Sequence, residues 1–316
     1  MNLKHFFATC VVGLALTACN NSSTSTNNET TAQLPDAKEV KTLRVASNAE
    51  FAPFEYTQEN GDIVGFDIDL INAMADAGGF KVEIQNTPWE GIFTRLNSGD
   101  SDVLLSAITI TDERKQTMDF TNPYFEIHQL IMTTENSDIQ SLEDLKNNKK
   151  VGVVTGQTGD LAISAMLGAT NDKISRYDSV ILAVKALQNG AVDAIVSDSA
   201  TVETYAKNNP ETKFVLIQSD QFEREDYGMA TRKGDAETLQ MLNDALGKVR
   251  SNGKYDEIYN KYFAQNAQES QTPQATPENN VAEEPSVVLE KPGELLEEPR
   301  EMTIEEAPPP NFPTTN

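Results

Sequence analysis

Cysteine is nearly absent from this sequence, since its 316 residues contain only Cys10 and Cys19. Both lie close to the N-terminus, so we expect no disulfide and no thiol chemistry in the fold. Basic residues are also few, because 25 lysines and arginines face 49 aspartates and glutamates, which gives a formal net charge of −24. This balance argues against nucleic acid as a partner, because phosphate binding needs basic patches.

An apolar run long enough to span a bilayer is also missing. The longest apolar stretch, Phe6–Leu16, follows Lys4 and His5 and has the length of a signal-peptide core. It ends in Leu16-Thr17-Ala18-Cys19, which resembles the bacterial lipobox. The resemblance implies that residues 1–18 are removed and that Cys19 carries lipid as the sole membrane anchor. The alternative is an ordinary signal peptide with a chance cysteine.

Two further segments are too polar to form a core. Residues 19–41 begin with a tract of Asn, Ser and Thr, and we predict a disordered tether there. Residues 266–316 are rich in proline and contain eleven glutamates against Lys291 and Arg300. We predict that this C-terminal segment is a disordered acidic tail.

Between these segments, strands alternate with helices in two rounds. The first round runs from the strand at 43–46 to the strand at 103–105, and the second from 151–154 to 194–196. The pattern also predicts a short helix at 142–145 before the second round. After that round it predicts a strand at 227–231, a long helix at 237–251 and a short helix from Gly253. Alternation of this kind predicts an α/β protein with mostly parallel sheets flanked by helices, and two rounds favour two lobes.

Polar residues follow several of the predicted strands. They are Asn48, the segment Thr109–Arg114, Gln157 to Gly159, and Asp198. In such sheets, ligands bind beyond the carboxyl ends of the strands and at helix N-termini, so these residues predict one shared site.

The chemistry of this set suits a free amino acid. A carboxylate needs a bidentate cation such as Arg114, assisted by Thr158 at a helix start. An ammonium group needs hydrogen-bond acceptors, and we predict that Asp198, the Thr109 hydroxyl and the Ala107 carbonyl fill this role. Phe51 and Trp89 are then expected to stack on the aliphatic part of the ligand.

Each of these residues also has a structural alternative. Arg114 can pair with Asp112 or Glu113 on a solvated helix start. Asp198 can serve as a helix N-cap, and Phe51 and Trp89 can belong to the core. The sequence chemistry by itself leaves these alternatives open.

Four motifs resemble the polar-amino-acid-binding proteins of bacterial ABC importers, which form solute-binding family 3. The motifs are Phe51-Ala52-Pro53-Phe54, Gly65 to Leu70 (GFDIDL), Ile108 to Arg114 (ITITDER) and Gly253 to Tyr259 (GKYDEIY). The resemblance covers residues 43–263 and implies that Arg114 binds the ligand carboxylate, with Thr109 beside it. It likewise implies that Asp198 takes the α-ammonium and that Phe51 and Trp89 stack on the ligand.

The resemblance also implies the two-lobe periplasmic-binding-protein fold, type II, with a two-strand hinge. We expect the first lobe at 42–123 plus 227–265, the second at 135–219, and crossings at 124–134 and 220–226. Because Arg114 and Asp198 then lie in different lobes, ligand binding should favour the closed state, which the ABC transporter permease would recognise. We expect a monomer anchored to the cell envelope on its periplasmic side, without metal or cofactor.

Substrate choice remains open at this stage. Many family members carry an acid where this chain has Asn48, which favours a neutral polar ligand such as glutamine. Glu50 and Gln157 are candidate specificity residues, and Glu50 keeps basic ligands open.

Two other functions compete with transport. A dehydratase on the same fold needs an acid or base in the cleft, for which His128 and Glu50 are candidates. The pair Asp67 and Asp69 resembles a two-carboxylate catalytic site, but aspartates at this position are typical of a helix start. The remaining alternative is a ligand-sensing lipoprotein that feeds no transporter.

Overall fold

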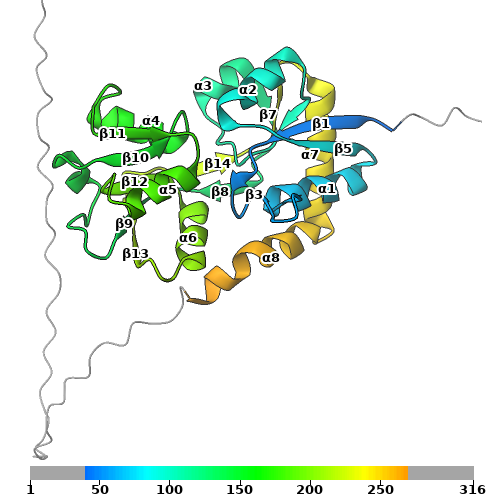
Figure 1. The fold of residues 1–316 in the computed structure, drawn as a ribbon. Coiled ribbons are helices and arrows are strands. Elements are labelled where there is room, and N and C mark those ends of the chain that lie inside the picture. Colours follow the sequence, from blue (N-terminus) through cyan, green and yellow to red (C-terminus); the bar gives the residue numbers. More distant parts are fainter. Residues whose placement is uncertain (1–39, 270–316) are drawn as a thin grey trace, which may run out of the picture. The chain divides into compact units, whose positions relative to one another are not determined.

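The computed structural model describes residues 40–269. The predicted signal peptide, Cys19, nearly all of the tether and most of the acidic tail lie outside the described residues. Within residues 40–269, no helix is both long enough and apolar enough to cross a bilayer. Figure 1 shows two groups of strands with helices packed around each, and the strands β8 and β14 running between them.

The first lobe is built on a five-stranded sheet in the order β5-β1-β6-β15-β7. β1 pairs in parallel with β5 and β6, whereas β15 is antiparallel to both β6 and β7. The bounds of these strands are Thr42–Ser47 for β1, Lys81–Asn86 for β5, Val103–Leu104 for β6, Met118–Phe120 for β7 and Ala230–Arg232 for β15.

The second lobe repeats this arrangement in the order β11-β10-β12-β9-β13. β10 pairs in parallel with β11 and β12, and β9 is antiparallel to β12 and β13. In each sheet the single reversed strand follows one of the two crossings between lobes. The bounds are Gln129–Thr134 for β9, Val151–Val154 for β10, Ile174–Tyr177 for β11, Ala194–Asp198 for β12 and Phe214–Ile217 for β13.

The two crossings form their own antiparallel ribbon. β8 (Phe125–Ile127) pairs with β14 (Glu225–Tyr227). A small antiparallel sheet of β2 (Glu50–Phe51), β3 (Glu55–Thr57) and β4 (Ile63–Val64) precedes the first long helix.

Helices cover the sheets of both lobes. α1 places Phe66, Leu70 and Met74 in the core at helical spacing, and it ends where Gly79 adopts a left-handed conformation with φ 72°. The helices of the first lobe are α1 Phe66–Gly78, α2 Trp89–Ser98, α3 Asp112–Thr117, α7 Ala236–Ser251 and α8 Lys254–Glu269. Those of the second lobe are the 3₁₀ helix η1 Glu143–Lys146, α4 Thr158–Leu167, α5 Val180–Gln188 and α6 Ser199–Asn208.

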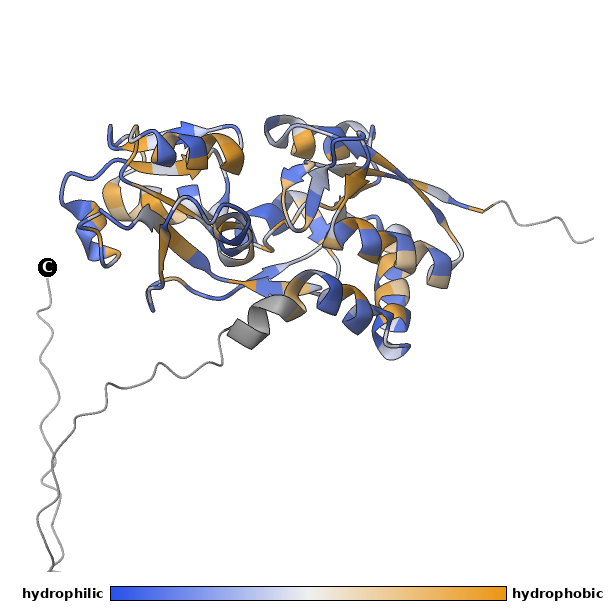
Figure 2. Cartoon of the chain, turned by 60° about the horizontal axis from the view of Figure 1, so that its bottom comes forward, coloured by the Kyte–Doolittle hydropathy of each residue, from blue (hydrophilic) through white to orange (hydrophobic). Residues whose placement is uncertain are grey.

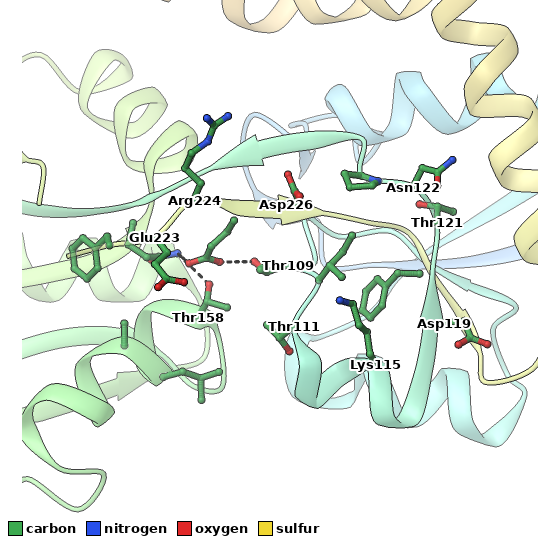
Figure 3. Close-up of a pocket in the computed structure, with 18 of the residues that line it drawn as sticks. Thr109, Thr111, Lys115, Asp119, Thr121, Asn122, Thr158, Glu223, Arg224 and Asp226 are labelled. Atoms are coloured by element: carbon green, nitrogen blue, oxygen red, sulfur yellow. Dashed lines mark hydrogen bonds between the residues drawn. The ribbon is translucent and has the colours of Figure 1, made fainter. Parts of the chain in front are cut away.

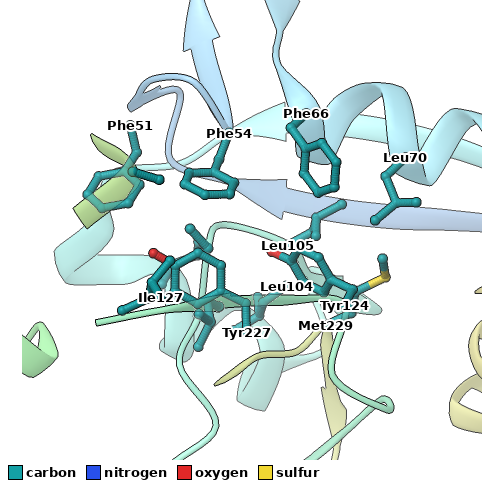
Figure 4. Packing of buried hydrophobic residues seen from close by; sticks show 14 of the residues in the cluster. Phe51, Phe54, Phe66, Leu70, Leu104, Leu105, Tyr124, Ile127, Tyr227 and Met229 are labelled. Carbon is teal, nitrogen blue, oxygen red and sulfur yellow. The ribbon is translucent and has the colours of Figure 1, made fainter. Parts of the chain in front are cut away.

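An aromatic cluster fixes the hinge ribbon to the first lobe. The Phe54 ring lies 5.1 Å from Tyr227 of β14 and 4.9 Å from Phe125 of β8, measured between ring centroids. Phe263 of α8 closes the cluster, 4.8 Å from Phe125. Figure 4 shows Phe54, Phe66, Tyr124 and Tyr227 gathered in this layer. In Figure 2 apolar colour concentrates in the strands, while the helices alternate between polar and apolar residues.

The predicted two-lobe α/β architecture is confirmed, with three local differences. The strand predicted at 227–231 is two strands, because the chain leaves the β8 ribbon after Tyr227 and joins the first sheet at Ala230. The terminal helix is not short, since α8 continues to Glu269, past the predicted start of the tail at residue 266. The helix predicted at 142–145 is one turn of 3₁₀ helix at Glu143–Lys146.

Candidate ligand-binding site

The candidate site lies where strands of both sheets end. A cleft of about 840 Å³ is lined by Thr109, Thr158, Gln129 and Glu225, among others. Figure 3 shows Thr109 and Thr158 on opposite sides of this cleft, and dashed lines mark the hydrogen bonds that join each of them to a side chain between them. A second cavity of about 340 Å³ is lined by residues that include Trp89, Phe93, Thr155 and Gly156.

Arg114 lies in the first turn of α3 and reaches residues of both cavities. Thr111 caps this helix, since its hydroxyl accepts a hydrogen bond from the Arg114 backbone N–H at 3.1 Å. The guanidinium donates through Nη1 to the Thr109 carbonyl at 2.9 Å and through Nη2 to the Gly156 carbonyl at 3.3 Å. Lys115, rather than Arg114, pairs with Asp112. The guanidinium is therefore directed into the site and contacts both lobes.

Two aromatic rings flank the Arg114 guanidinium. Its Cζ lies 5.6 Å from the ring centroid of Trp89 and 5.4 Å from that of Phe93, within the range of cation–π attraction. Burial lowers the pKa of Arg114, while the charges of Asp198 and Glu225 raise it. Because the ordinary pKa of arginine is so high, this cation stays charged.

Asp198 ends β12 and is 4% exposed. It occupies the N-cap position of α6, but its side chain makes no capping hydrogen bond. Its Oδ1 accepts from Gln129 Nε2 at 2.7 Å, and its Oδ2 accepts from the Tyr227 hydroxyl at 2.5 Å. Burial raises the pKa of Asp198 to about 6, the charge of Glu225 adds to this, and the two donors and Arg114 oppose it.

Gln129 and Glu225 connect the two lobes at the hinge. Glu225 accepts from the Thr109 hydroxyl at 2.8 Å and from Gln129 Nε2 at 3.0 Å. Gln129 Nε2 also lies 3.1 Å from the Thr158 hydroxyl oxygen, so three oxygens compete for two amide hydrogens. This hub links Thr109 of one lobe with Thr158 and Asp198 of the other.

The helix start near Thr158 is packed tightly against the second sheet. A Cβ on Gly159 would lie 2.8 Å from the Val196 carbonyl oxygen and 2.9 Å from Gln129 Oε1, so glycine allows this close approach. Thr158 is the first residue of α4 and Gln157 is its N-cap residue, without a side-chain capping bond. The Thr158 hydroxyl thus lies at the positive end of α4.

Trp89 joins the lobes, whereas Phe51 belongs to a core. The Trp89 Nε1–H donates to the Thr155 carbonyl of the second lobe at 3.0 Å, and the residue is 7% exposed. Phe51 is buried and stacks on Phe54 with ring centroids 6.3 Å apart.

The remaining predicted residues divide into two groups. Asn48 and Ala107 are buried beside Ser106, whose hydroxyl accepts from the Asn48 backbone N–H at 3.0 Å. Glu50 is exposed and lines another groove, with residues of α5 and α6. The structure therefore links Arg114, Thr109, Thr158, Asp198 and Trp89 through hydrogen bonds and a cation–π contact, and leaves Glu50 outside that set.

Four residues of the site were not foreseen: Gln129, Glu225, Tyr227 and Phe93. The first three lie on or next to the hinge ribbon, where no periodic pattern indicates which side chain faces the cleft. Phe93 lies one turn after Trp89 in α2, and the two ring centroids are 5.1 Å apart. Within residues 40–269, no group of three or more His, Cys, Asp or Glu side chains is arranged to hold a metal ion.

This geometry suits a zwitterion. A permanent cation, Arg114, lies at one end and two carboxylates, Asp198 and Glu225, lie at the other. The two ends are close enough for the charge of Asp198 to raise the pKa of Arg114.

Comparison with known proteins agrees with this geometry. The sequence matches the model of the bacterial extracellular solute-binding proteins, family 3, over residues 43–265. A probable histidine-binding protein from Neisseria gonorrhoeae is 49% identical over 266 residues, covering 84% of this chain and 97% of that protein.

Two solved structures have the same fold. The arginine-, lysine-, histidine-binding protein ArtJ from Geobacillus stearothermophilus matches with a TM-score of 0.68 and 41% identity, covering 71% of this chain and 96% of ArtJ. The ancestral amino acid-binding protein AncCDT-1, a precursor of cyclohexadienyl dehydratase, matches with a TM-score of 0.64 and 38% identity. The match covers 70% of this chain and 95% of AncCDT-1. The chain described here belongs to the bacterial extracellular solute-binding proteins, family 3.

Proposed function

We propose that this protein is a receptor for a free amino acid, which it captures between its two lobes. The supporting observation is the opposed pair of Arg114 and Asp198, one from each lobe and both directed into the site. In this proposal Arg114 binds the ligand carboxylate with help from Thr158. Asp198 receives the ammonium group, with the Thr109 hydroxyl and the Ala107 carbonyl as further acceptors.

The proposed ligand has a basic side chain: arginine, lysine or histidine. The names of the relatives support this class, since they include histidine- and arginine-binding proteins. The aromatic faces of Trp89 and Phe93, which already attract the Arg114 guanidinium, supply a surface that also suits a ligand cation. Glutamine is the alternative ligand, and Asn48, Phe51 and Gln157 are proposed to take part in the choice, with Glu50 as a less central candidate.

We further propose delivery to an ABC import permease by a monomer tethered through lipid on Cys19. Ligand binding favours the closed arrangement of the lobes, because neither lobe alone pairs both ends of a zwitterion. The permease then recognises the closed form.

Dehydratase activity is the second candidate function, because AncCDT-1 is a precursor of such an enzyme. Asp198, with its pKa raised to about 6, is a buried carboxyl directed into the site and meets the chemical requirement for an acid or base. The two functions predict different results with purified protein, since only the enzyme converts prephenate or arogenate.

A thermal-shift panel of the twenty amino acids tests the proposal. A ligand present at 100 times its dissociation constant should stabilise the protein by roughly 2.7 kcal/mol. We expect the largest shifts with arginine, histidine or lysine, and a smaller shift or none with glutamine. If no amino acid raises the melting temperature, the receptor function is wrong, and formation of phenylpyruvate or phenylalanine would establish the enzyme.

A further inference from the structure

Two acidic side chains lie fully buried behind the candidate site, and the proposed function does not use them. Glu55 of β3 and Asp67 of α1 are both 0% exposed. They are neighbours, because the Asp67 backbone N–H donates to the Phe54 carbonyl, which directly precedes Glu55, at 2.9 Å. Burying two adjacent anions is costly unless their charge is compensated.

The donors that reach this pair are neutral. The Ser106 hydroxyl donates to Glu55 Oε1 at 2.9 Å. The Tyr124 hydroxyl and the Ala107 backbone N–H both donate to Asp67 Oδ2, at 2.7 and 3.0 Å. No cation compensates the pair through these contacts.

Each carboxyl also has one buried oxygen without a donor, namely Glu55 Oε2 and Asp67 Oδ1. A native structure rarely leaves two such oxygens unpaired within one cluster. The two carboxyl groups act on each other, because the charge of Asp67 and a hydrogen bond with its side chain both raise the pKa of Glu55. One proton between the two orphan oxygens satisfies both and removes one of the two buried charges.

We propose that Glu55 is a protonated acid at neutral pH, that it donates from Oε2 to Asp67 Oδ1, and that this pair positions the Ser106–Ala107 turn. Asp67 is the ionised member, since it receives two donors from outside the pair and Glu55 receives one. Burial raises the pKa of Glu55 well above its ordinary value, and the charges of Asp67 and Asp198 raise it further. Burial raises the pKa of Asp67 only to about 6, because Tyr124 and Ala107 oppose the shift.

The turn that the pair holds is part of the candidate site. Ala107 has φ 47°, a left-handed conformation that is uncommon for a residue with a side chain. Its N–H is fixed by Asp67, while Ser106 is fixed by Glu55 and accepts the backbone N–H of Asn48. Glu55 and Asp67 are therefore positioning residues for the segment that leads to Thr109 and Arg114. This role in the site rests on the proposed function, whereas the shared proton does not.

Infrared spectroscopy of the unliganded full chain tests the proton directly. At about pH 8, where exposed carboxyls and Asp198 are ionised, the parent protein should retain a carboxylic-acid C=O band. Glu55→Gln should lose that band, because the amide replaces the protonated group. Asp69→Asn is the matched control, since Asp69 lies in the same first turn of α1 but pairs with Lys261, and this variant should keep the band.

Stability against pH is the second readout. A raised carboxyl pKa means that the folded state holds the proton longer, so the contribution of Glu55 to the stability of the parent falls as pH rises above 4.5. Glu55→Gln lacks this contribution, and its stability relative to the parent should increase from about pH 5 to pH 8. Titration of Asp67 and Tyr124, which face Glu55, is common to both proteins.

Binding of arginine completes the test. Glu55→Gln should keep its affinity within about threefold, because the amide donates to Asp67 and accepts from Ser106. Glu55→Leu, which does neither, should bind at least about tenfold more weakly. Absence of the acid band in the parent at about pH 8, or its persistence in Glu55→Gln, would overturn the proposal. Both results are obtained without ligand and are independent of whether the protein is a receptor.

Discussion

Two buried acidic clusters adjoin the Ser106–Arg114 segment, and they differ in what surrounds them. Asp198 and Asp67 are both buried, each accepts a tyrosine hydroxyl, and the pKa of each is raised to about 6. Asp198, however, lies near the charged groups Arg114 and Glu225, whereas Asp67 has neutral donors and the neighbouring Glu55.

The difference means that Asp198 can still gain a cationic partner from a ligand, whereas Asp67 already has Glu55 as its partner. The Asp198 cluster contains one cation and two carboxylates, so an incoming ammonium group completes its charge balance. In the Glu55–Asp67 cluster, one proton pairs the two carboxyls and removes one of their two charges. The first arrangement suits ligand binding and the second suits a fixed scaffold.

Removal of the Arg114 cation from the Asp198 cluster should weaken ligand binding more than any other substitution proposed below. Arg114→Ala leaves the ligand carboxylate without its bidentate partner, and we expect arginine binding to weaken by about 1000-fold. Isothermal titration calorimetry measures the loss. Lys254→Ala is the control, because Lys254 is a cation outside the residues that line this cleft and pairs with Glu257. Normal affinity in the Arg114 variant would refute the assignment of the carboxylate site.

Neutralisation of Asp198 should have the next largest effect. Asp198→Asn keeps the shape but removes the anion for the ammonium group, and arginine binding should weaken by about 100-fold. Parent affinity should also fall as pH drops below about 6, because protonated Asp198 cannot pair with the ammonium group. Arginine is the suitable probe, since its own charges are constant between about pH 5 and pH 8.

The unliganded proteins should differ in the opposite sense. The folded pKa of Asp198 is raised, so its contribution to the stability of the parent falls as pH rises from 3.8 to about 6. Asp198→Asn lacks this loss and should become relatively more stable over that range in urea titrations. A variant whose binding kept the pH dependence of the parent would show that another group titrates.

Substitution of Glu225, which belongs to the Asp198 cluster, should have a smaller effect on binding. Glu225→Gln removes a negative charge that raises the pKa of Asp198, so the midpoint of arginine binding should move to lower pH. The affinity at neutral pH should fall by about tenfold, because the second carboxylate at the ammonium end is lost. Glu223→Gln provides the control, since Glu223 lines the same cleft and is exposed. Equal behaviour of the two variants would remove Glu225 from the site.

The two tyrosines offer the smallest and most closely matched test. Tyr227→Phe removes a donor from Asp198 and should shift the pH midpoint of binding upward, with an affinity loss of about threefold. Tyr124→Phe removes the corresponding donor from Asp67 and should leave that midpoint unchanged. Each variant should lose about 1–2 kcal/mol of unfolding free energy in denaturant titrations. A shift of the binding midpoint in Tyr124→Phe would mean that the two clusters are coupled.

Much of the architecture could be predicted from local patterns. The alternation of strands and helices predicted two α/β lobes, and the polar residues after strands predicted the location of the site. The prediction of the architecture succeeds because side-chain period and capping chemistry act within a few residues. Thr111 at the N-cap of α3, which directs Arg114, is one example.

Other features depend on segments far apart in the chain. Glu225 and Gln129 are separated by 96 residues and meet because β14 pairs with β8 and thereby brings the two crossings together. The antiparallel strands β9 and β15 were likewise not distinguished, because their direction is set by how the chain returns from a crossing.

The sequence alone therefore determined the fold class and the chemical types required at the site: a permanent cation, a carboxylate and hydroxyl groups at strand ends. The tertiary structure decided which groups meet. It set Glu225 beside Asp198, placed Glu50 in another groove, and buried Glu55 against Asp67. The physical reason is that charge balance and burial depend on three-dimensional neighbours, whereas a sequence pattern specifies local geometry.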